Sequence, residues 1–166
     1  MNRTLALIKP DAVDRNIIGE IIALIEQNGF IIRDMKFMKM SQSIAERFYE
    51  AHKEKPFYDK LVTYMTSGNI IALILEKDNA VRLFRDLIGS TDPELAKEGT
   101  IRKLYAIDKS FNSVHGSDSD ANAFIVDGSS KNVGIGLASP ANFKLDVAGD
   151  VGPSAYSSHD LGTDYI

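Results

Sequence analysis

Short apolar runs alternate with amphipathic stretches along the first two-thirds of the chain. Residues 4–8 and residues 69–75 are short and largely apolar, which predicts two strands. Residues 30–40, with Ile32 and Met35 among their apolar side chains, predict a third strand. A helix is predicted from about residue 17 to residue 27, because its apolar residues follow helical spacing before an Asn-Gly end: Ile18, Ile21, Ile22 and Ile25.

Three further helices and one strand complete the predicted order. Ser41 is a suitable N-cap for a helix that carries Ala45, Phe48 and Tyr49. Helices are also predicted at residues 58–65 and at residues 79–88, and Gly89 ends the second of them. Residues 104–107 are predicted to be the last strand of the core. Strands that alternate with helices in this way indicate an α+β fold, a ferredoxin-like sandwich with a mainly antiparallel four-stranded sheet.

The composition changes near residue 124. Charged residues that favour helices dominate before this point, whereas residues 124–166 contain no Glu, Arg or Met and hold six of the 12 Gly. We therefore expect two segments: a folded domain at residues 1–123 and a Gly/Ser-rich C-terminal extension at residues 124–166, either strand-forming or disordered. The alternation of Phe143, Leu145 and Val147 with charged residues is typical of a strand.

Overall composition excludes several classes of protein. The chain has no Cys, which rules out disulfides and thiolate metal sites, and it has no run of about 18 apolar residues that would cross a membrane. Its net charge of −4 disfavours broad nucleic-acid binding, which needs clustered Lys and Arg. The apolar run near the N-terminus is too short for the core of a signal peptide, so we expect a cytoplasmic protein.

Three histidines are candidates for chemistry. His159 lies in the Gly/Ser-rich extension and His52 in a charged stretch, where a solvated surface role is the default. His115 differs, because the small polar residues around it, Ser113 and Gly116 among them, would leave its ring accessible to a ligand. A lone histidine is usually structural, so the residues alone leave catalysis and a structural role both open.

The sequence contains no Walker loop, no Gly-x-Ser-x-Gly and no cluster of metal ligands around its histidines. Loops instead carry scattered polar groups, namely Lys9, Arg85, Thr91 and Arg102. Taken singly, the cations among them are typical of surface ion pairs that contribute little. If they converged on His115 they would bind a polyphosphate, because phosphoryl transfer depends mainly on charge neutralisation.

Five ordered blocks resemble one family. They are Thr4–Val13, Gly19–Ile22, His52–Tyr58, Gly99–Arg102 and, most specific of all, Asn112 followed by His115-Gly116-Ser117-Asp118-Ser119. In content and spacing these blocks resemble nucleoside diphosphate kinases over about residues 2–123. The resemblance implies a homo-oligomeric enzyme that transfers the γ-phosphate of a nucleoside triphosphate to a nucleoside diphosphate. The transfer would follow a ping-pong cycle through phosphorylated His115.

The resemblance also implies a role for each matching residue. Lys9 would bond the ribose hydroxyl and the transferring phosphate, Asn112 the ribose, Arg85 and Thr91 the β-phosphate, and Arg102 the β/γ region. Tyr49 and Ser117 would lie beside His115, Phe57 would stack on the base, and His52 would lie near the α-phosphate, which is the weakest of these assignments. Mg²⁺ would enter on the nucleotide phosphates rather than in a protein site.

The sequence departs from the family at its last helix. A family Glu, whose carboxylate holds the ring nitrogen that is not phosphorylated, is replaced here by Val126. Unless Asp118, Asp120 or another chain takes the place of that carboxylate, the histidine loses control of its tautomer and orientation. A second interpretation is therefore a nucleotide-binding protein with reduced or no turnover.

The extension supports a third interpretation. Residues 132–136 and 143–151 weakly resemble segments of bacterial surface proteins and phage tail fibres, which precede self-assembly regions. In that case the protein would be an assembly protein driven by its extension, with the kinase-like part as a scaffold.

Overall fold

The computed structural model describes residues 2–117, 124–127 and 132–135, with only the backbone of the last two ranges. Its main sheet has the strand order β2-β3-β1-β4, and every neighbouring pair is antiparallel. The strands are β1 (Arg3–Ile8), β2 (Ile31–Lys39), β3 (Asn69–Glu76) and β4 (Val114–Gly116). This arrangement confirms the α+β, ferredoxin-like sandwich predicted from the sequence.

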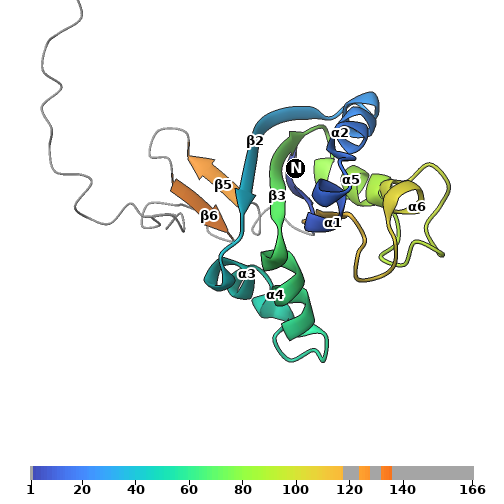
Figure 1. Ribbon diagram of the computed structural model, residues 1–166. Helices are drawn as coiled ribbons and strands as arrows, with labels where there is room; N and C mark the ends of the chain where they lie inside the picture. Colours follow the sequence, from blue (N-terminus) through green and yellow to red (C-terminus); the bar gives the residue numbers. More distant parts are fainter. Residues whose placement is uncertain (1, 118–123, 128–131, 136–166) are drawn as a thin grey trace, which may run out of the picture.

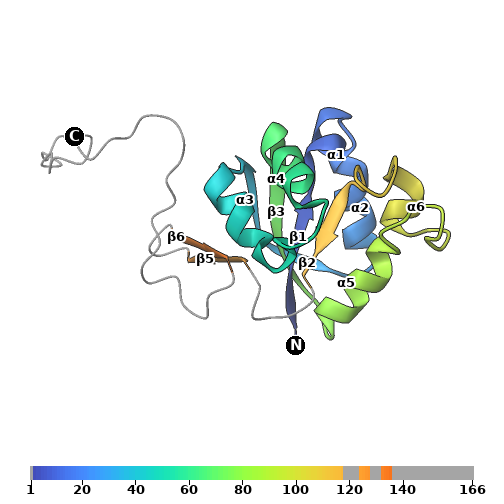
Figure 2. The ribbon, with the colours of Figure 1, turned by 90° about the horizontal axis from the view of Figure 1, so that it is seen from below.

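Helices cover both faces of the sheet, as Figures 1 and 2 show. On one face lie α1 (Pro10–Asp14), α2 (Ile18–Gln27), α5 (Ala80–Ile88) and α6 (Ile101–Tyr105). On the other lie α3 (Gln42–Phe48), the short 3-10 helix η1 (Glu50–His52) and α4 (Tyr58–Ser67). A sheet buried on both faces explains why its central strands, β1 and β3, are largely apolar rather than alternating.

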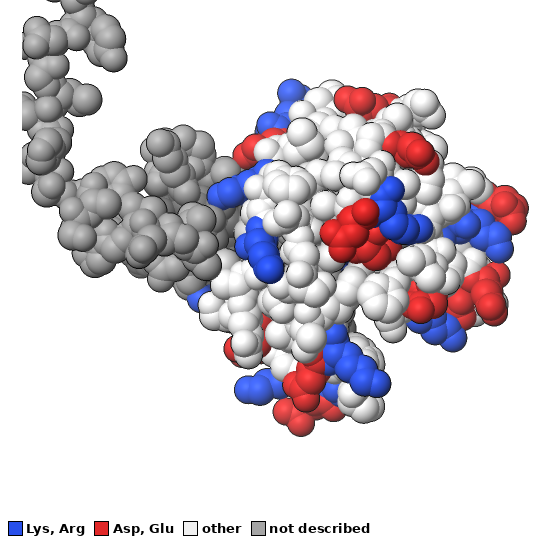
Figure 3. Space-filling model, in the orientation of Figure 1, with Lys and Arg blue, Asp and Glu red and all other residues white. Residues whose placement is uncertain are grey.

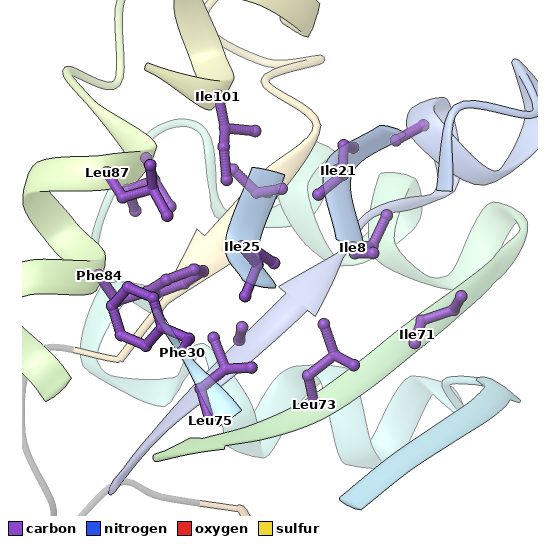
Figure 4. Packing of buried hydrophobic residues seen from close by; sticks show 14 of the residues in the cluster. Ile8, Ile21, Ile25, Phe30, Ile71, Leu73, Leu75, Phe84, Leu87 and Ile101 are labelled. Atoms are coloured by element: carbon purple, nitrogen blue, oxygen red, sulfur yellow. The ribbon is translucent and has the colours of Figure 1, made fainter. Parts of the chain in front are cut away.

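The two faces of β1 contribute to two separate cores. Ala6 and Ile8 pack with α2, β3 and α5, where Phe30 meets Phe84 edge to face at 5.6 Å between ring centroids (Figure 4). Leu5 and Leu7 point to the other face and pack against residues of α3 and α4. This alternation follows from the period of two in a strand, and Lys9 comes directly after Ile8, the last residue of β1.

Local signals in the sequence account for most of the boundaries. The Ser41 hydroxyl accepts a hydrogen bond from the backbone N–H of Ile44 and so caps α3, as predicted. Gly29 and Gly89 follow the ends of α2 and α5 with φ of +76° and +81°, a conformation that favours glycine. Helix α1, which the sequence reasoning did not anticipate, begins with Pro10 at its first position.

The predicted last strand at residues 104–107 is wrong. Residues 101–105 form helix α6, with Ile101 fully buried, whereas Leu104 and Ile107 are more than half exposed. The place beside β1 is taken by β4, in which Gly116 pairs with Ala6 of β1 and His115 pairs with Leu7. A three-residue strand that contains His and Gly carries no apolar run, so pattern alone could not find it.

Beyond the main sheet, β5 (Phe124–Asp127) and β6 (Asn132–Ile135) form an antiparallel hairpin in which Val126 pairs with Val133. The position of the family Glu thus lies on a strand and not on a helix. The strand predicted around residues 143–147 lies outside the described residues. Among the helices that the structure describes, none has the length and hydrophobicity of a membrane-spanning segment.

Candidate active site

His115 lies in the middle of β4, an edge strand, at the end of the sheet where β1 stops. It is partly buried, and two rings from the end of α3 approach it edge to face. The ring centroid of Phe48 is 5.1 Å from that of His115, and the ring centroid of Tyr49 is 6.1 Å away. The structure therefore places Tyr49 beside His115, as expected, and adds Phe48, which the sequence reasoning missed as a site residue.

A series of rings continues outward from Tyr49. Its ring stacks on His52 at 6.4 Å, and His52 in turn lies 6.0 Å from Phe57. Tyr49 is buried, whereas His52 and Phe57 are exposed. The aromatic series thus leads from the partly buried histidine to an exposed ring on which a flat group could stack.

Lys9 is a buried cation at the end of β1. Its ammonium donates a hydrogen bond of 2.7 Å to the Asn112 side-chain oxygen, and its exposed fraction is 5%. Burial, together with the nearby positive charge of Arg102, lowers the pKa of Lys9 to about 8, and Asp11 opposes this change. A cation held in this way is a strong partner for an anion that can enter the site.

Arg102 is the second buried cation. Its guanidinium donates hydrogen bonds to the backbone carbonyls of Gly89 at 2.9 Å and Val114 at 3.1 Å. Burial and the neighbouring charge of Arg85 lower the pKa of Arg102 to about 10. Arg102 therefore connects the end of α5 to the histidine strand, and its charge interacts with both Lys9 and Arg85.

Gly89 makes this placement of Arg102 possible. A Cβ atom at Gly89 would lie 2.5 Å from the Thr100 hydroxyl oxygen, so only glycine fits between the end of α5 and the start of α6. The same glycine carries the carbonyl that holds Arg102. The sequence signal that ended the helix thus also shapes the site.

Two unpartnered polar atoms belong to this region. Of the described side chains, only three have a buried polar atom without a hydrogen-bond partner, namely Thr4 Oγ1, Tyr49 Oη and Arg102 Nε. Buried polar groups are nearly always hydrogen-bonded in a complete structure. Two of the three atoms thus belong to residues that the family resemblance assigns to the site.

The remaining predicted residues differ in how closely the structure brings them to His115. Ser117 is buried directly after β4, where its N–H donates to the carbonyl of Leu5. Arg85 and Thr91 are exposed, Arg85 in the last turn of α5 and Thr91 in the loop that follows. The charge of Arg85 interacts with that of Arg102.

The described residues contain no group of three or more His, Cys, Asp or Glu side chains that could hold a metal ion. The charges that converge here are cationic, and they suit phosphate oxygens rather than a metal. On the face drawn in Figure 3, acidic and basic side chains are interspersed over the surface. This face therefore carries no extended basic surface of the kind that nucleic-acid backbones require.

A buried polar cluster lies directly behind the site and escaped the sequence reasoning. Asp11 accepts hydrogen bonds from Arg15, Tyr64 and Ser113, and it is only 8% exposed. The available signal was Asp11 itself, a carboxylate that immediately follows a buried strand and a Pro. Such a carboxylate must find donors if it is to be buried.

Comparison with known proteins decides the family. The family model for nucleoside diphosphate kinase matches residues 2–125. The chain belongs to the nucleoside diphosphate kinase family. The resemblance inferred from the five sequence blocks is thereby confirmed.

Individual relatives agree with this assignment. The nucleoside diphosphate kinase of Lawsonia intracellularis is 56% identical over 125 residues, which cover 75% of this chain and 91% of the relative. That of Chlorobaculum tepidum is 53% identical, covering 75% and 89% respectively. The Halobacterium salinarum kinase, solved in complex with CDP, is 40% identical with a TM-score of 0.70, over 74% of this chain and 82% of that one.

Proposed function

We propose that this member of the nucleoside diphosphate kinase family transfers phosphate through His115 in a two-step cycle. In the first step a neutral ring nitrogen of His115 attacks the γ-phosphorus of a nucleoside triphosphate. The N–P bond forms as the bond to the bridging oxygen breaks, and the diphosphate leaves with that oxygen. A second diphosphate then attacks the same phosphorus through its terminal oxygen, and the N–P bond breaks.

The observation that carries this proposal is the set of cations near His115. Lys9 and Arg102 are both buried. The positive charge of Arg102 disfavours the charged form of Lys9, and the positive charge of Arg85 disfavours the charged form of Arg102. A polyphosphate would neutralise all three charges, and charge neutralisation is the main requirement of phosphoryl transfer. Family membership favours this proposal over the binding-only and assembly interpretations.

The roles proposed for the other residues are those that the family resemblance implies. Asn112, already bonded to Lys9, would bind the ribose beside the Lys9 ammonium. Arg85 and Thr91 would hold the β-phosphate, and Arg102 would bind the β/γ region. Tyr49 and Ser117 flank His115 and would support it, Phe57 would stack on the base, and His52 would approach the α-phosphate.

Magnesium completes the proposed substrate. The cations of the site fit the phosphate oxygens, and those oxygens together with water supply the ligands that Mg²⁺ prefers. The bound ion would neutralise phosphate charge, while Lys9 and Arg102 orient the phosphates toward His115. A CDP complex of the Halobacterium salinarum relative supports nucleotide binding by this fold.

The decisive experiment detects the phosphohistidine directly. Brief incubation with γ-labelled ATP and Mg²⁺ is expected to give an acid-labile, base-stable label that chases onto added GDP. His115→Ala should remove the label, whereas His159→Ala, a histidine in the extension, should retain it. Nucleotide binding without any label would instead favour the binding-only interpretation that the replacement by Val126 raised.

We also propose that residues 1–123 form the catalytic domain and that residues 124–166 are an unrelated extension. The family match, which ends at residue 125, supports this boundary. Truncation after Ala123 should leave label transfer within about threefold of the full chain, since surface changes away from a site rarely cost more. Loss of all transfer would place part of the active site in the extension.

A homo-oligomer is a further part of this proposal, and edge strand β2 supports it. Ile31, Met35 and Phe37 are each more than half exposed on β2, an unusual concentration of large apolar side chains. Sedimentation of the wild type and of Phe37→Asp tests it, because a charge would separate subunits that meet through β2. A cytoplasmic location stays a prediction of the sequence.

A further inference from the structure

Ser113 occupies a strained turn immediately before the histidine strand. Its φ is +64°, in the left-handed region that favours glycine, and its side chain is fully buried. The N–H of Val114 donates a 2.7 Å hydrogen bond to the carbonyl of Asn112, which closes a three-residue turn around Ser113. Turns of this kind with a positive φ are rare, and they persist only where surrounding structure holds them.

The Ser113 hydroxyl provides that hold. It lies 2.8 Å from the Asp11 carboxylate and 3.0 Å from the Tyr105 carbonyl, either of which can accept its single hydrogen. It also accepts a 2.9 Å hydrogen bond from Arg15. The turn is therefore fastened through a side chain to α1 and to the end of α6.

The partners of Ser113 are themselves fixed to one another. Arg15 donates to the Asp11 carboxylate at 3.1 Å and to the Tyr105 carbonyl at 2.6 Å. Tyr64 of α4 donates to the second oxygen of Asp11. Because every member is bonded to at least one other, movement of the hydroxyl would disturb the whole buried network.

Functional groups flank the turn on both sides. Asn112, directly before Ser113, accepts the hydrogen bond from the Lys9 ammonium, and His115 follows two residues later. The Ser113 carbonyl accepts a 2.9 Å bond from the Lys9 backbone N–H. The same turn thus sets where the buried cation, its amide partner and the histidine lie relative to one another.

We propose that Ser113 is a positioning residue for His115 and for the Lys9–Asn112 pair. Its hydroxyl, held by Asp11 and Arg15, fixes the positive-φ turn from which both groups project. This inference rests on the proposed function of His115. With Val126 in place of the family Glu, the turn is a means of orienting His115 that remains in the described part of the chain.

Two substitutions at Ser113 distinguish the effect of its hydroxyl from the effect of the backbone strain. Ser113→Ala removes the hydroxyl and keeps the strain, whereas Ser113→Gly removes both and suits a positive φ. We expect each variant to slow phosphohistidine formation by about 10- to 100-fold, because small displacements at a reacting centre have effects of this size. The nucleotide concentration for half-maximal rate should change less than the maximal rate.

Three comparisons distinguish a positioning effect of Ser113 from a general loss of stability. Ile21→Val shortens a fully buried side chain of α2 away from the site, so its labelling rate should stay near that of the wild type at a similar drop in melting temperature. Ser113→Gly should fold at least as well as Ser113→Ala. A double-mutant cycle of Ser113→Ala with Asp11→Asn should be non-additive, since both act through one network.

A second readout does not depend on turnover. The ring signals of His115 in the NMR spectrum, assigned with His115→Gln, should shift in Ser113→Gly, while those of His159 stay in place. Ser113→Gly with the wild-type labelling rate and unshifted His115 signals would overturn the proposal. If the wild type itself takes up no label, the proposed function fails, and the His115 signals alone then decide whether Ser113 positions the ring.

Discussion

The two ends of the candidate site differ in burial. At the end proposed to bind the phosphates and the ribose, Lys9, Arg102 and Asn112 are between 4% and 8% exposed, and each is hydrogen-bonded within the protein. At the other end, Phe57 is 50% exposed, and its ring contact within the described part of the chain is with His52. The first end is built before a ligand arrives, whereas the second is an open surface.

This difference matches two kinds of recognition. A phosphate needs charges in fixed places, and buried cations with backbone partners supply them without losing side-chain freedom on binding. A nucleobase offers a flat face whatever its identity, so an exposed ring can stack on any of them. We therefore expect large, specific effects from the buried end and small, base-independent effects from the exposed end.

The largest effect beyond His115 itself should come from Arg102. Arg102→Met is expected to lower kcat/KM by about 100- to 1,000-fold, the usual consequence of removing a donor aimed at developing charge. Steady-state transfer from ATP to GDP measures it. Arg102→Lys, which keeps the charge but loses the fork that reaches Gly89 and Val114, should lie between Met and the wild type.

Arg102→Met also tests how much Arg102 contributes to the stability of the fold. Loss of the guanidinium leaves two backbone carbonyls without their donor, which should lower the free energy of unfolding by roughly 1–3 kcal/mol. Urea unfolding followed by circular dichroism measures this loss. Activity of Arg102→Met within threefold of the wild type would remove the contrast between the two ends of the site.

The pH dependence of kcat/KM should come next in size. Burial disfavours the charged form of Lys9 and lowers its pKa to about 8, so the free protein loses this cation as the pH rises through that value. Because the proposed phosphate binding needs the Lys9 ammonium, kcat/KM should fall above pH 8, by about tenfold per pH unit well beyond it. Measurements from pH 6.5 to 9.5 on the wild type and on Lys9→Arg test the assignment.

Arginine keeps its proton throughout that range, so the decline should be absent from Lys9→Arg even if its overall activity is lower. A decline of the same shape in both proteins would assign the titration to another group.

Phe57 should show a smaller effect. Stacking of a base on an aromatic side chain contributes about 1–3 kcal/mol, and the exposure of Phe57 places it at the lower end. Phe57→Leu should therefore raise KM by roughly 5- to 10-fold for ATP and GTP alike. Phe57→Tyr keeps the ring and serves as the matched control, and a change confined to one nucleotide would contradict simple stacking.

The smallest effect is expected from His52. This exposed ring stacks on Tyr49 and adjoins Phe57, so His52→Gln should change kcat/KM by about twofold, near the lower limit for an aromatic pair. Initial rates at low ATP concentration measure it. A tenfold or larger loss would mean that the exposed end does more than stack, and it would favour a direct contact of His52 with phosphate.

Much of the fold follows from the sequence because the patterns are strong and local. The period of helix α2, the N-cap at Ser41 and the glycine after α5 each report a conformation set by a few neighbouring residues. The failure at residues 104–107 has the opposite cause. An apolar tetrapeptide fits a strand or a helix equally well, and β4 occupies the place beside β1 that the predicted strand would have taken.

The candidate site divides in the same way. His115, Lys9 and Arg102 could be selected from the sequence because their blocks resemble a family. Phe48 and Ser113 could not be selected, because an apolar ring on a helix and a small polar residue in a loop occur throughout proteins. Their importance arises from the ring contact with His115 and from the turn with a φ of +64°.

By itself, the sequence determined most of the helices, three of the four strands of the main sheet, and which chemical groups the chain carries. The tertiary structure decided which of those groups meet. Lys9 and Asn112 are 103 positions apart, yet they share a 2.7 Å hydrogen bond. Local patterns reach only one or two turns along the chain, and such a contact depends on how sheet order and helix packing return distant segments to the same place.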